Sequence, residues 1–275
     1  MRPYTFAGGT AVVTGAAGGI GAALARGLAR RGSSLVLLDR DAAGLEAVAG
    51  AIRAAHPSVS VTTHVVDLAD PAATRAAGET LRERHPETTL LVNNAGVALA
   101  GRFDQVTAEE FDWLLQVNLH AVVTLTRALL PALKAHPGSH LVTVSSLFGL
   151  IAPAGQSAYA TSKFAVRGFT EALRHELAAD GVGVTSVHPG GIRTRIAADA
   201  RIGSGVPAAE TEAGRRDFER LLTMDPAKAA EVVLRAVERR RPRQLVGWSA
   251  VVPDLLARLL PGAHGRLLAA LGRRR

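Results

Sequence analysis

A tyrosine and a lysine lie four residues apart in the stretch SAYATSKFAV, residues 157–166, of a chain that has only two tyrosines. In a helix, positions i and i+4 share a face, which would place the phenol of Tyr159 beside the ammonium group of Lys163. A nearby positive charge favours the phenolate and lowers the pKa of a tyrosine. The pair could therefore exchange a proton near neutral pH. The alternative is that the two side chains are only neighbours on a surface helix.

A glycine-rich turn follows an apolar run near the start of the chain, in TGAAGGIG, residues 14–21. Its glycines allow the backbone to turn tightly and to approach a phosphate group. The free N–H groups of a helix that begins near Ile20 would favour that anion. The spacing G-x-x-x-G-x-G is a variant of the dinucleotide-binding pattern. A tight strand-to-helix connection without a ligand is the alternative.

A carboxylate ends the next apolar run, at Asp39. At this position it can accept hydrogen bonds from both ribose hydroxyls of an adenosine, and it repels a 2′-phosphate. Arg40 could instead bind that phosphate, whereas Gly18 stands where a basic residue would help NADP. We therefore favour NAD as the cofactor, with NADP possible. Asp39, and likewise Asp67 after the third run, could also be helix-capping residues.

The elements that must position these groups alternate along the chain. Apolar, β-rich runs are separated by segments of helical period, such as residues 19–31 and 105–135. This pattern predicts an α/β fold, a doubly wound Rossmann-like parallel sheet of about seven strands with helices on both faces. We expect a single domain over residues 1–275. The expected strands are TAVVTG, SSLVLLD, VSVTTHVVD, TLLVNNAG, SHLVTVSS, VGVTSVHPG and RQLVGWS.

Residues 195–224 interrupt this alternation directly after a strand end and are rich in alanine, glycine and charge. Ligands of open α/β sheets bind beyond the carboxyl ends of the strands. We therefore predict that this segment is a substrate lid. A disordered surface loop is the alternative.

The composition excludes several kinds of site. The chain has no cysteine, so it has neither disulfides nor thiolate metal ligands. Its nine histidines are scattered along the chain with no cysteine nearby, and we expect no metal site. Ser145 and Ser146 lack the G-x-S-x-G pattern of many hydrolases. With no leader-like start and no apolar run of about 18 residues, we expect a soluble cytoplasmic protein.

The formal net charge of +8 comes from one end of the chain. Residues 235–275 hold ten arginines against Glu238 and Asp254, and the remainder is neutral. A neutral body argues against a nucleic-acid partner. Residues 253–275 have the pattern of a basic amphipathic helix. We expect this extension to pack near the lid or at a subunit contact, with weak contact to a membrane surface as the alternative.

These motifs together resemble the classical short-chain dehydrogenase/reductase family. The resemblance covers about residues 8–194 and implies hydride transfer between a nicotinamide and a substrate carbon. It also implies a homodimer or homotetramer. It is carried by Gly15, Gly19 and Gly21, NNAG at 93–96, Asn118, Ser146 thirteen residues before Tyr159, Lys163, and HPGGIRT at 188–194.

The resemblance assigns roles to four residues. Tyr159 would exchange a proton with the substrate oxygen, and Ser146 would hold that oxygen. Lys163 would bind the nicotinamide ribose and lower the pKa of the tyrosine, and Asn118 would hold a water that links the lysine to solvent. The implied cofactor contacts are Thr14, Gly15, Gly19, Ile20, Gly21, Asp39, Arg40, Asp67, Leu68, Asn94, Ala95, Gly96, Tyr159, Lys163, Pro189, Gly190, Ile192 and Thr194.

The residues that flank the predicted site are mostly small or apolar. This composition favours a hydrophobic secondary alcohol or ketone as substrate, unless these side chains belong to the core. A second function stays open, a non-catalytic NAD-binding sensor or scaffold that signals through its basic tail. The predicted substrate pocket is Ala98, Leu99, Ser146, Leu147, Phe148 and Gly191.

Overall fold

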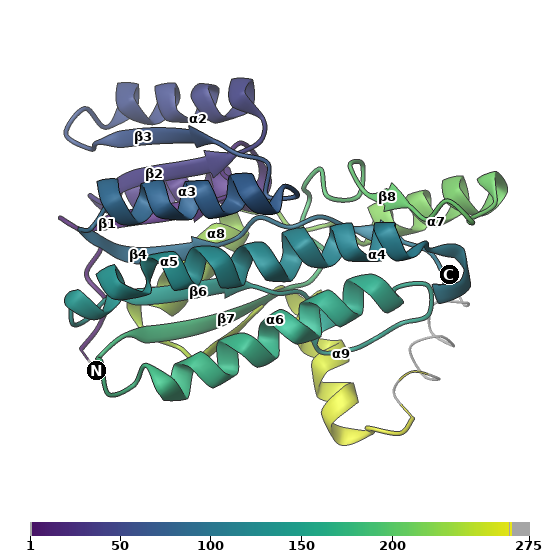
Figure 1. The fold of residues 1–275 in the computed structure, drawn as a ribbon. Helices are drawn as coiled ribbons and strands as arrows, with labels where there is room; N and C mark the ends of the chain where they lie inside the picture. Colours follow the sequence, from purple (N-terminus) through teal and green to yellow (C-terminus); the bar gives the residue numbers. More distant parts are fainter. Residues whose placement is uncertain (1, 264, 266–275) are drawn as a thin grey trace.

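A parallel sheet of seven strands lies at the centre of the structure, a computed structural model that describes residues 2–263 and 265 (Figure 1). The strand order is β3-β2-β1-β4-β6-β7-β9, and every neighbouring pair is parallel. All seven strands expected from the apolar runs are confirmed. They are β1 Thr10–Thr14, β2 Ser34–Asp39, β3 Val61–Val65, β4 Thr88–Asn93, β6 His140–Val144, β7 Gly183–Pro189 and β9 Arg243–Val246.

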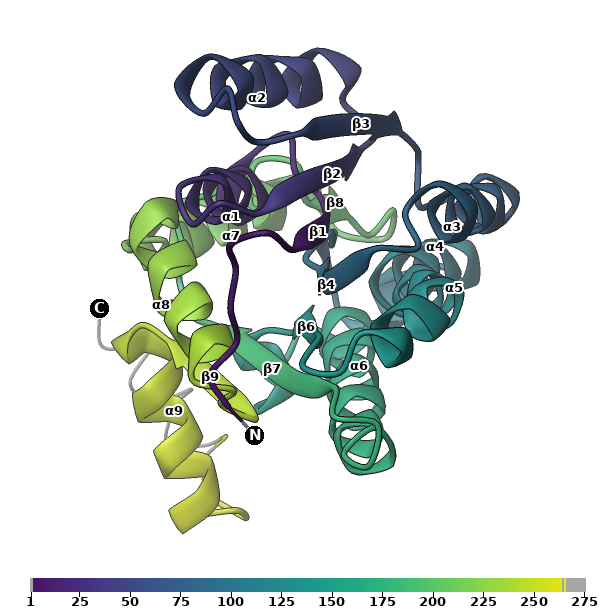
Figure 2. The same cartoon turned by 90° about the vertical axis from the view of Figure 1, so that its left-hand side faces the viewer.

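Helices cover both faces of this sheet, as predicted. Helices α1 (Gly19–Ala29), α2 (Ala42–Ala55) and α8 (Pro226–Glu238) lie on one face. Helices α3 (Pro71–Arg84), α5 (Ala121–Ala135) and α6 (Ser157–Glu176) lie on the other (Figure 2). The sheet therefore has a separate apolar core on each side.

Strand alternation explains how the two cores form. In β1, Val13 points into the core beneath α1 and α8, and Val12 points into the core beneath α5. Both side chains are fully buried. Successive side chains of a strand point to opposite faces, so a strand covered on both sides must be apolar throughout.

Aspartates define where several helices begin. The side chains of Asp41, Asp70 and Asp225 accept backbone hydrogen bonds at the starts of α2, α3 and α8. Asp70 and Asp225 are each followed by proline, which fits the first helical position because its N–H is not needed there. These caps hold the strand-to-helix turns that face the site.

The chain reverses direction across the sheet between β1 and β4. From β1 it winds outward through β2 to β3, and it then returns to place β4 on the other side of β1. In a doubly wound sheet this reversal opens a crevice beyond the carboxyl ends of the strands. The glycine-rich turn follows β1, and NNAG follows β4 at the same edge.

The long helical segment predicted over 105–135 is interrupted by one π-helical turn. A short 3-10 turn, η1 (Phe103–Gln105), precedes α4 (Ala108–Leu115), and the π turn η2 (Gln116–His120) joins α4 to α5. By length and composition alone, the run Ala108–Ala135 could cross a membrane. Its α5 part packs against α3 and β4, as a core helix does.

The predicted lid forms ordered elements rather than a structureless loop. It contains β8 (Arg201–Ile202) and α7 (Ala208–Leu221). Strand β8 pairs in parallel with β5 (Leu99–Ala100), which makes a small second sheet. The segment is therefore attached to the chain beyond β4.

The C-terminal extension begins earlier than expected. Its helix, α9, runs over Trp248–Leu259, not from residue 253. It follows β9 directly, because Gly247 has a positive φ of 87° that reverses the chain between them. The rest of the predicted amphipathic extension, residue 264 and residues 266–275, lies outside the described residues.

Candidate active site

Tyr159 and Lys163 lie on one face of α6, as the spacing predicted. Their side chains are 7% and 3% exposed. The Lys163 Nζ atom lies 5.7 Å from the centre of the Tyr159 ring and donates a hydrogen bond to the carbonyl oxygen of Val144 at 3.2 Å. The two groups are therefore not chance neighbours on a solvated surface.

The protonation of this pair differs from the prediction. Burial raises the pKa of Tyr159 to about 12, and a hydrogen bond with the Ser146 side chain lowers it in part. Burial lowers the pKa of Lys163 to about 8. In the chain by itself the pKa of Tyr159 is therefore raised, not lowered as predicted, because desolvation dominates and the Lys163 ammonium bonds a carbonyl instead of the phenol. The phenol is thus protonated at neutral pH.

Ser146 stands just beyond the carboxyl end of β6, at the start of the 3-10 turn η3 (Leu147–Gly149). Its Oγ accepts a hydrogen bond from the backbone N–H of Phe148 at 3.1 Å. The same side chain lies close enough to Tyr159 to lower the pKa of the phenol in part. The structure therefore brings the two hydroxyl groups together, as a site for one substrate oxygen requires.

Ser145 and Gly149 fix the distance between η3 and α6. The Oγ of Ser145 donates to the carbonyl oxygen of Lys163 at 2.8 Å. A Cβ atom at Gly149 would overlap that Oγ and would lie 2.7 Å from the carbonyl oxygen of Lys163. Only glycine at position 149 allows η3 to approach α6 this closely. The close approach places Ser146 beside Tyr159. Neither role was predicted, because the contact joins segments far apart in the sequence.

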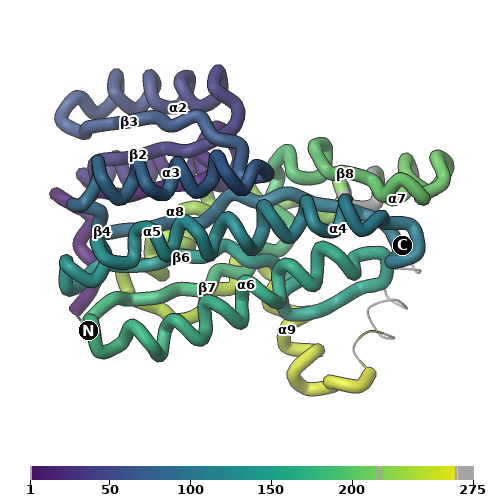
Figure 3. The backbone as a smooth tube through the Cα atoms, in the orientation of Figure 1, coloured from purple at the N-terminus to yellow at the C-terminus, as the bar shows by residue number. Residues whose placement is uncertain are grey.

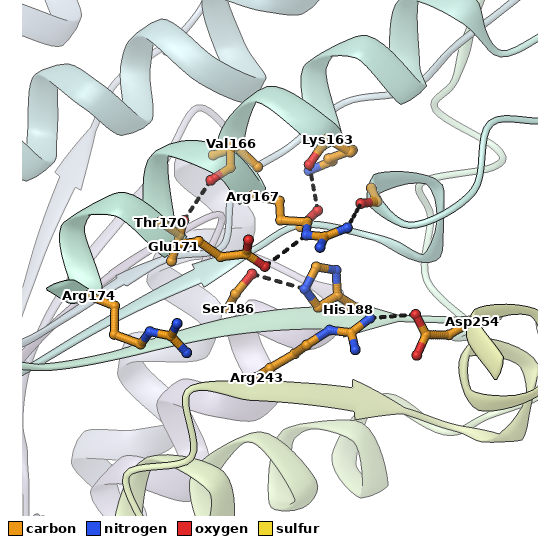
Figure 4. A network of polar contacts seen from close by, with 12 residues as sticks. Lys163, Val166, Arg167, Thr170, Glu171, Arg174, Ser186, His188, Arg243 and Asp254 are labelled. Carbon is orange, nitrogen blue, oxygen red and sulfur yellow. Dashed lines mark hydrogen bonds and ion pairs between the residues drawn. The ribbon is translucent and has the colours of Figure 1, made fainter. Parts of the chain in front are cut away.

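His188 supports Ser146 from the neighbouring strand, and Figure 4 shows its ring beside Ser186. Its ring is fully buried at the end of β7, with Nδ1 3.1 Å from the carbonyl oxygen of Ser146 and Nε2 3.0 Å from the Oγ of Ser186. Burial lowers the pKa of His188 to about 4, so the ring is neutral at pH 7. A carbonyl can only accept, so Nδ1 carries the proton and Nε2 accepts from Ser186.

Asn118 lies in the π turn η2, a type of bulge that is frequent at functional sites. Its Nδ2 donates to the carbonyl of Val97 and to the Oγ of Ser162, both at 3.0 Å, and its Oδ1 accepts from the N–H of Val97 at 2.9 Å. A Cβ atom at Gly96 would lie 3.2 Å from that Oδ1 and 3.1 Å from the Nζ of Lys163. The asparagine is buried and does not line the cleft. Its water-holding role stays a prediction.

A cleft of ≈ 1680 Å³ opens at the carboxyl ends of the strands. Tyr159, Lys163 and Ser146 line its inner wall, and residues 195–202 contribute to another. Most predicted cofactor contacts line the same cleft, namely Gly15, Gly19, Ile20, Asp39, Arg40, Asp67, Leu68, Asn94, Ala95, Gly96, Pro189, Gly190, Ile192 and Thr194.

The glycine-rich turn fits a pyrophosphate. Gly15 and Gly19 have positive φ values of 68° and 54°, which side chains disfavour. A Cβ atom at Gly21 would overlap the carbonyl oxygen of Gly15, whereas the space beside Gly18 is open. No side chain caps the start of α1, and its first turn holds no acidic residue. The N–H groups there suit an anion.

Asp39 is held in place by the turn that it faces. Its Oδ2 accepts from the N–H of Ala17 at 2.9 Å, and its Oδ1 accepts from the N–H of Asp41 at 3.1 Å. Helix α2 is capped by Asp41 and helix α3 by Asp70, so the helix-capping alternatives for Asp39 and Asp67 are wrong. Both carboxylates stand at the cleft instead.

Three predicted contacts do not line the cleft. The Oγ1 of Thr14 accepts from the N–H groups of Asn94 and Ala95, both at 3.0 Å, and so joins β1 to β4. Gly21 packs against the backbone of Gly15. Leu99 is 1% exposed and belongs to the core of β5, so its assignment to the substrate pocket is wrong.

The outer cleft contains apolar residues that were not predicted. The other predicted pocket residues, Ala98, Leu147, Phe148 and Gly191, do line it. The added residues come from α4, from the loop before α6, from the lid and from α9, and no local pattern marks them. They include Trp113, Ile151, Pro153, Ile196, Leu221, Trp248 and Val252.

Among the residues that the structure describes, no group of three or more His, Cys, Asp or Glu could hold a metal ion. Two histidines beyond the site, His64 and His85, have neighbouring rings at 5.7 Å, but only Glu87 joins them.

Comparison with known proteins agrees with this geometry. The family model described as short chain dehydrogenase matches residues 9–204. The chain is 38% identical to SadH of Mycobacterium tuberculosis over 270 residues, 97% of this chain and 96% of SadH. A short-chain dehydrogenase/reductase from Burkholderia phymatum, solved with NAD, has a TM-score of 0.84 and 28% identity, covering 93% of this chain and 95% of its own. A short-chain dehydrogenase from Sphingobium yanoikuyae, solved with NADPH, has a TM-score of 0.76 and 31% identity, with 95% of each chain covered.

Proposed function

The chain belongs to the classical short-chain dehydrogenase/reductase family, and from that premise we propose that it transfers a hydride between NAD and a hydrophobic secondary alcohol or ketone. The observation that carries the proposal is the contact between the Ser146 and Tyr159 hydroxyl groups beside buried Lys163, all at one cleft. In the reducing direction, the ketone oxygen accepts hydrogen bonds from both hydroxyl groups. A reduced nicotinamide held in the cleft by residues such as Gly19, Asp39 and Thr194 would supply the hydride.

Tyr159 supplies the proton. Its pKa of about 12 keeps the phenol protonated at neutral pH, so it can donate to the oxygen as negative charge develops there. The ammonium of Lys163, 5.7 Å from the ring centre, then stabilises the phenolate that is left. In the oxidising direction the same atoms act in reverse, and the phenolate accepts the alcohol proton.

Asp39 supports NAD as the preferred cofactor. Its carboxylate is fixed at the cleft by two backbone N–H groups, where it can accept from ribose hydroxyls and would repel a 2′-phosphate. Arg40 lines the same wall and keeps NADP possible. The relatives of known structure bind both types of cofactor. Calorimetric binding of NAD and NADP to Asp39→Asn tests this preference, with Asp180→Asn, which lies outside the cleft, as the control.

The outer cleft supports a hydrophobic substrate. Trp113, Phe148, Ile151 and Pro153 line the cleft together with Tyr159, and the Phe148 ring lies 6.0 Å from the Tyr159 ring. Binding sites of this kind take most of their affinity from apolar contact and their orientation from a few polar groups. A panel of secondary alcohols and ketones of increasing apolar size would define the substrate class.

The Tyr159→Phe variant tests the proposal directly. Turnover, followed by nicotinamide absorbance, should fall on the order of 10²–10⁴-fold, while NAD still binds and the protein stays folded. If no substrate in a broad panel is turned over although NAD binds, the alternative of a non-catalytic NAD sensor is supported. Full turnover by Tyr159→Phe would contradict the assigned role.

The family relationship also supports a homo-oligomer. Phe164 on α6 is 40% exposed, which fits a partly covered subunit contact on that helix. Light scattering after size-exclusion chromatography measures the oligomeric state. Phe164→Ser should shift the population towards monomer if α6 forms the contact.

A further inference from the structure

One side of helix α9 is apolar and exposed. Trp248, Val252, Leu255 and Leu259 are 80%, 51%, 54% and 68% exposed. Their spacing of four, three and four residues places them along one face of the helix. We call these four residues the α9 stripe. Single exposed hydrophobic residues are common on proteins, but a contiguous stripe marks an interaction surface.

Helix α9 is held firmly, so the orientation of the stripe is fixed. Asp254 forms ion pairs with Arg243 of β9 at 2.5 Å and with Arg258 at 3.2 Å (Figure 4). Ala250 is fully buried, and the Oγ of Ser249 accepts from the N–H of Gly191 at 2.9 Å. The opposite face of α9 therefore packs on the body, and α9 extends outward from it (Figure 3).

The sequence from the start of α9 to the C-terminus is basic. Residues 248–275 contain five arginines and a single acidic residue, Asp254. That carboxylate is 7% exposed and forms ion pairs with Arg258 and with Arg243 of β9. An exposed apolar stripe on a strongly basic segment is the composition of helices that lie on anionic lipid surfaces.

The α9 stripe is continuous with the cleft. Trp248 and Val252 belong to the stripe and also line the cleft. Leu221 at the end of α7 lines the cleft beside them and is 55% exposed. Apolar surface thus runs from the outside of the molecule to the entrance of the site.

We propose that the α9 stripe docks on the surface of an anionic lipid bilayer. Trp248 would lie at the headgroup level, where tryptophan is favoured, and the leucines would enter the acyl boundary. If the proposed function holds, an apolar alcohol or ketone dissolved in the bilayer reaches Tyr159 without crossing water.

Vesicle co-sedimentation tests the docking. The probes are phosphatidylcholine vesicles with and without phosphatidylglycerol, and the variant is the pair Leu255→Ser and Leu259→Ser, which lie outside the cleft. The matched control is Val65→Ser, a 62% exposed residue of β3 at the opposite edge of the sheet. Binding should require phosphatidylglycerol and should weaken at least about tenfold in the double variant but not in the control.

Fluorescence and light scattering separate the possible results. Anionic vesicles should shift Trp248 emission to shorter wavelength, and vesicles with brominated acyl chains should quench it. Equal binding by the double variant, or no binding by the intact chain, overturns the proposal. Conversion of an oligomer to a monomer by the double variant also overturns it, because the stripe would then be a subunit contact.

The proposed function is checked separately with a short, water-soluble ketone. Its turnover should be equal in the intact chain, the double variant and Val65→Ser. If none of them turns it over, the proposed function fails, and the vesicle result still decides whether the stripe docks.

Discussion

The imidazole of His188 donates a hydrogen bond to the main-chain carbonyl of Ser146, with 3.1 Å between Nδ1 and the oxygen. This contact joins the end of β7 to the start of η3, where the serine hydroxyl meets Tyr159. His188 is itself fixed by Ser186, which lies two residues earlier on the same strand. The position of the Ser146 side chain thus depends on a buried, neutral histidine that does not line the cleft.

Replacement of this histidine should affect both stability and rate. His188→Ala leaves the Ser146 carbonyl and the Ser186 hydroxyl without their partner, which should lower the free energy of unfolding by about 1–3 kcal/mol. We expect kcat to fall while the KM for NAD is unchanged, because the Ser146 hydroxyl would be displaced and this group is proposed to face the substrate. Urea unfolding and steady-state kinetics measure the two effects.

Two further variants make this prediction specific. His188→Gln can still donate to the carbonyl and should recover part of kcat. His175→Ala, at an exposed position of α6, should change neither quantity. A loss of stability with normal kcat would show that His188 supports only the fold.

The buried charge of Lys163 should lower the free energy of unfolding. Its pKa is lowered to about 8 by burial, against about 10.4 for an exposed lysine. The folded chain therefore binds this proton less tightly than the unfolded chain does. The cost of the buried charge is full below pH 8 and is relieved as the pH rises from about 8 to about 10.4.

Lys163→Met should remove this cost. At pH 7 we expect the free energy of unfolding to rise by about 1–3 kcal/mol, while turnover is lost. Lys228→Met, at an exposed position of α8, should change stability by less than about 0.5 kcal/mol. Lower stability of Lys163→Met would mean that the hydrogen bond to Val144 outweighs the cost of burying the charge.

Local sequence was sufficient for the sheet and for the pairing of Tyr159 with Lys163 on one helix face. The strands were found because runs such as TAVVTG have a continuous apolar centre, as expected for a strand that is covered on both faces. Tyr159 and Lys163 were paired by helical spacing alone. Both features depend on residues close together in the chain.

Features that depend on distant contacts were missed or mistaken. The support of Ser146 by His188 spans 42 positions, and the cleft wall formed by Trp248 depends on where α9 packs. The pKa of Tyr159 was misjudged because burial is a property of the folded chain and outweighs the neighbouring charge. Leu99 was misplaced because an apolar residue near the site can equally belong to the core.

Two buried histidines should make the fold sensitive to mild acid. Burial lowers the pKa of His140 to about 3 and that of His188 to about 4, against about 6.5 in the unfolded chain. The unfolded state thus binds more protons below pH 6.5, so stability is full above that pH and is lost as the pH falls towards 4. Each histidine should cost about 1.5 kcal/mol between pH 6.5 and 5.

Urea unfolding across this pH range measures the effect. His140→Gln keeps a polar group near Thr185 and removes one titrating ring, so it should flatten the pH dependence by about half. His56→Gln, outside both cores, is the control. If the pH dependence of stability is the same in His140→Gln and in the unchanged chain, His140 does not contribute to the acid sensitivity.

The lid segment is attached to the body by Arg201. The guanidinium of Arg201 lies 3.6 Å from the centre of the Trp113 ring. The main-chain N–H of Arg201 donates to the carbonyl of Ala98 at 3.0 Å. Next along the chain, the N–H of Ser204 donates to Glu110 at 3.0 Å. The backbone bonds do not depend on the side chain of Arg201, so that side chain can be removed without deleting β8.

Arg201→Ala should therefore loosen the lid without unfolding the protein. The lost cation–π contact is worth about 0.5–2 kcal/mol, and Trp113 also lines the cleft, so the KM for substrate should rise about 2–30-fold. Thermolysin should cleave residues 195–224 faster, and Arg201→Lys should be intermediate. Arg216→Ala is the control within the same segment, since its side chain is 64% exposed and forms an ion pair with Glu212 on the same helix. Equal proteolysis and equal KM in Arg201→Ala and Arg216→Ala would show that the ring contact does not hold the lid.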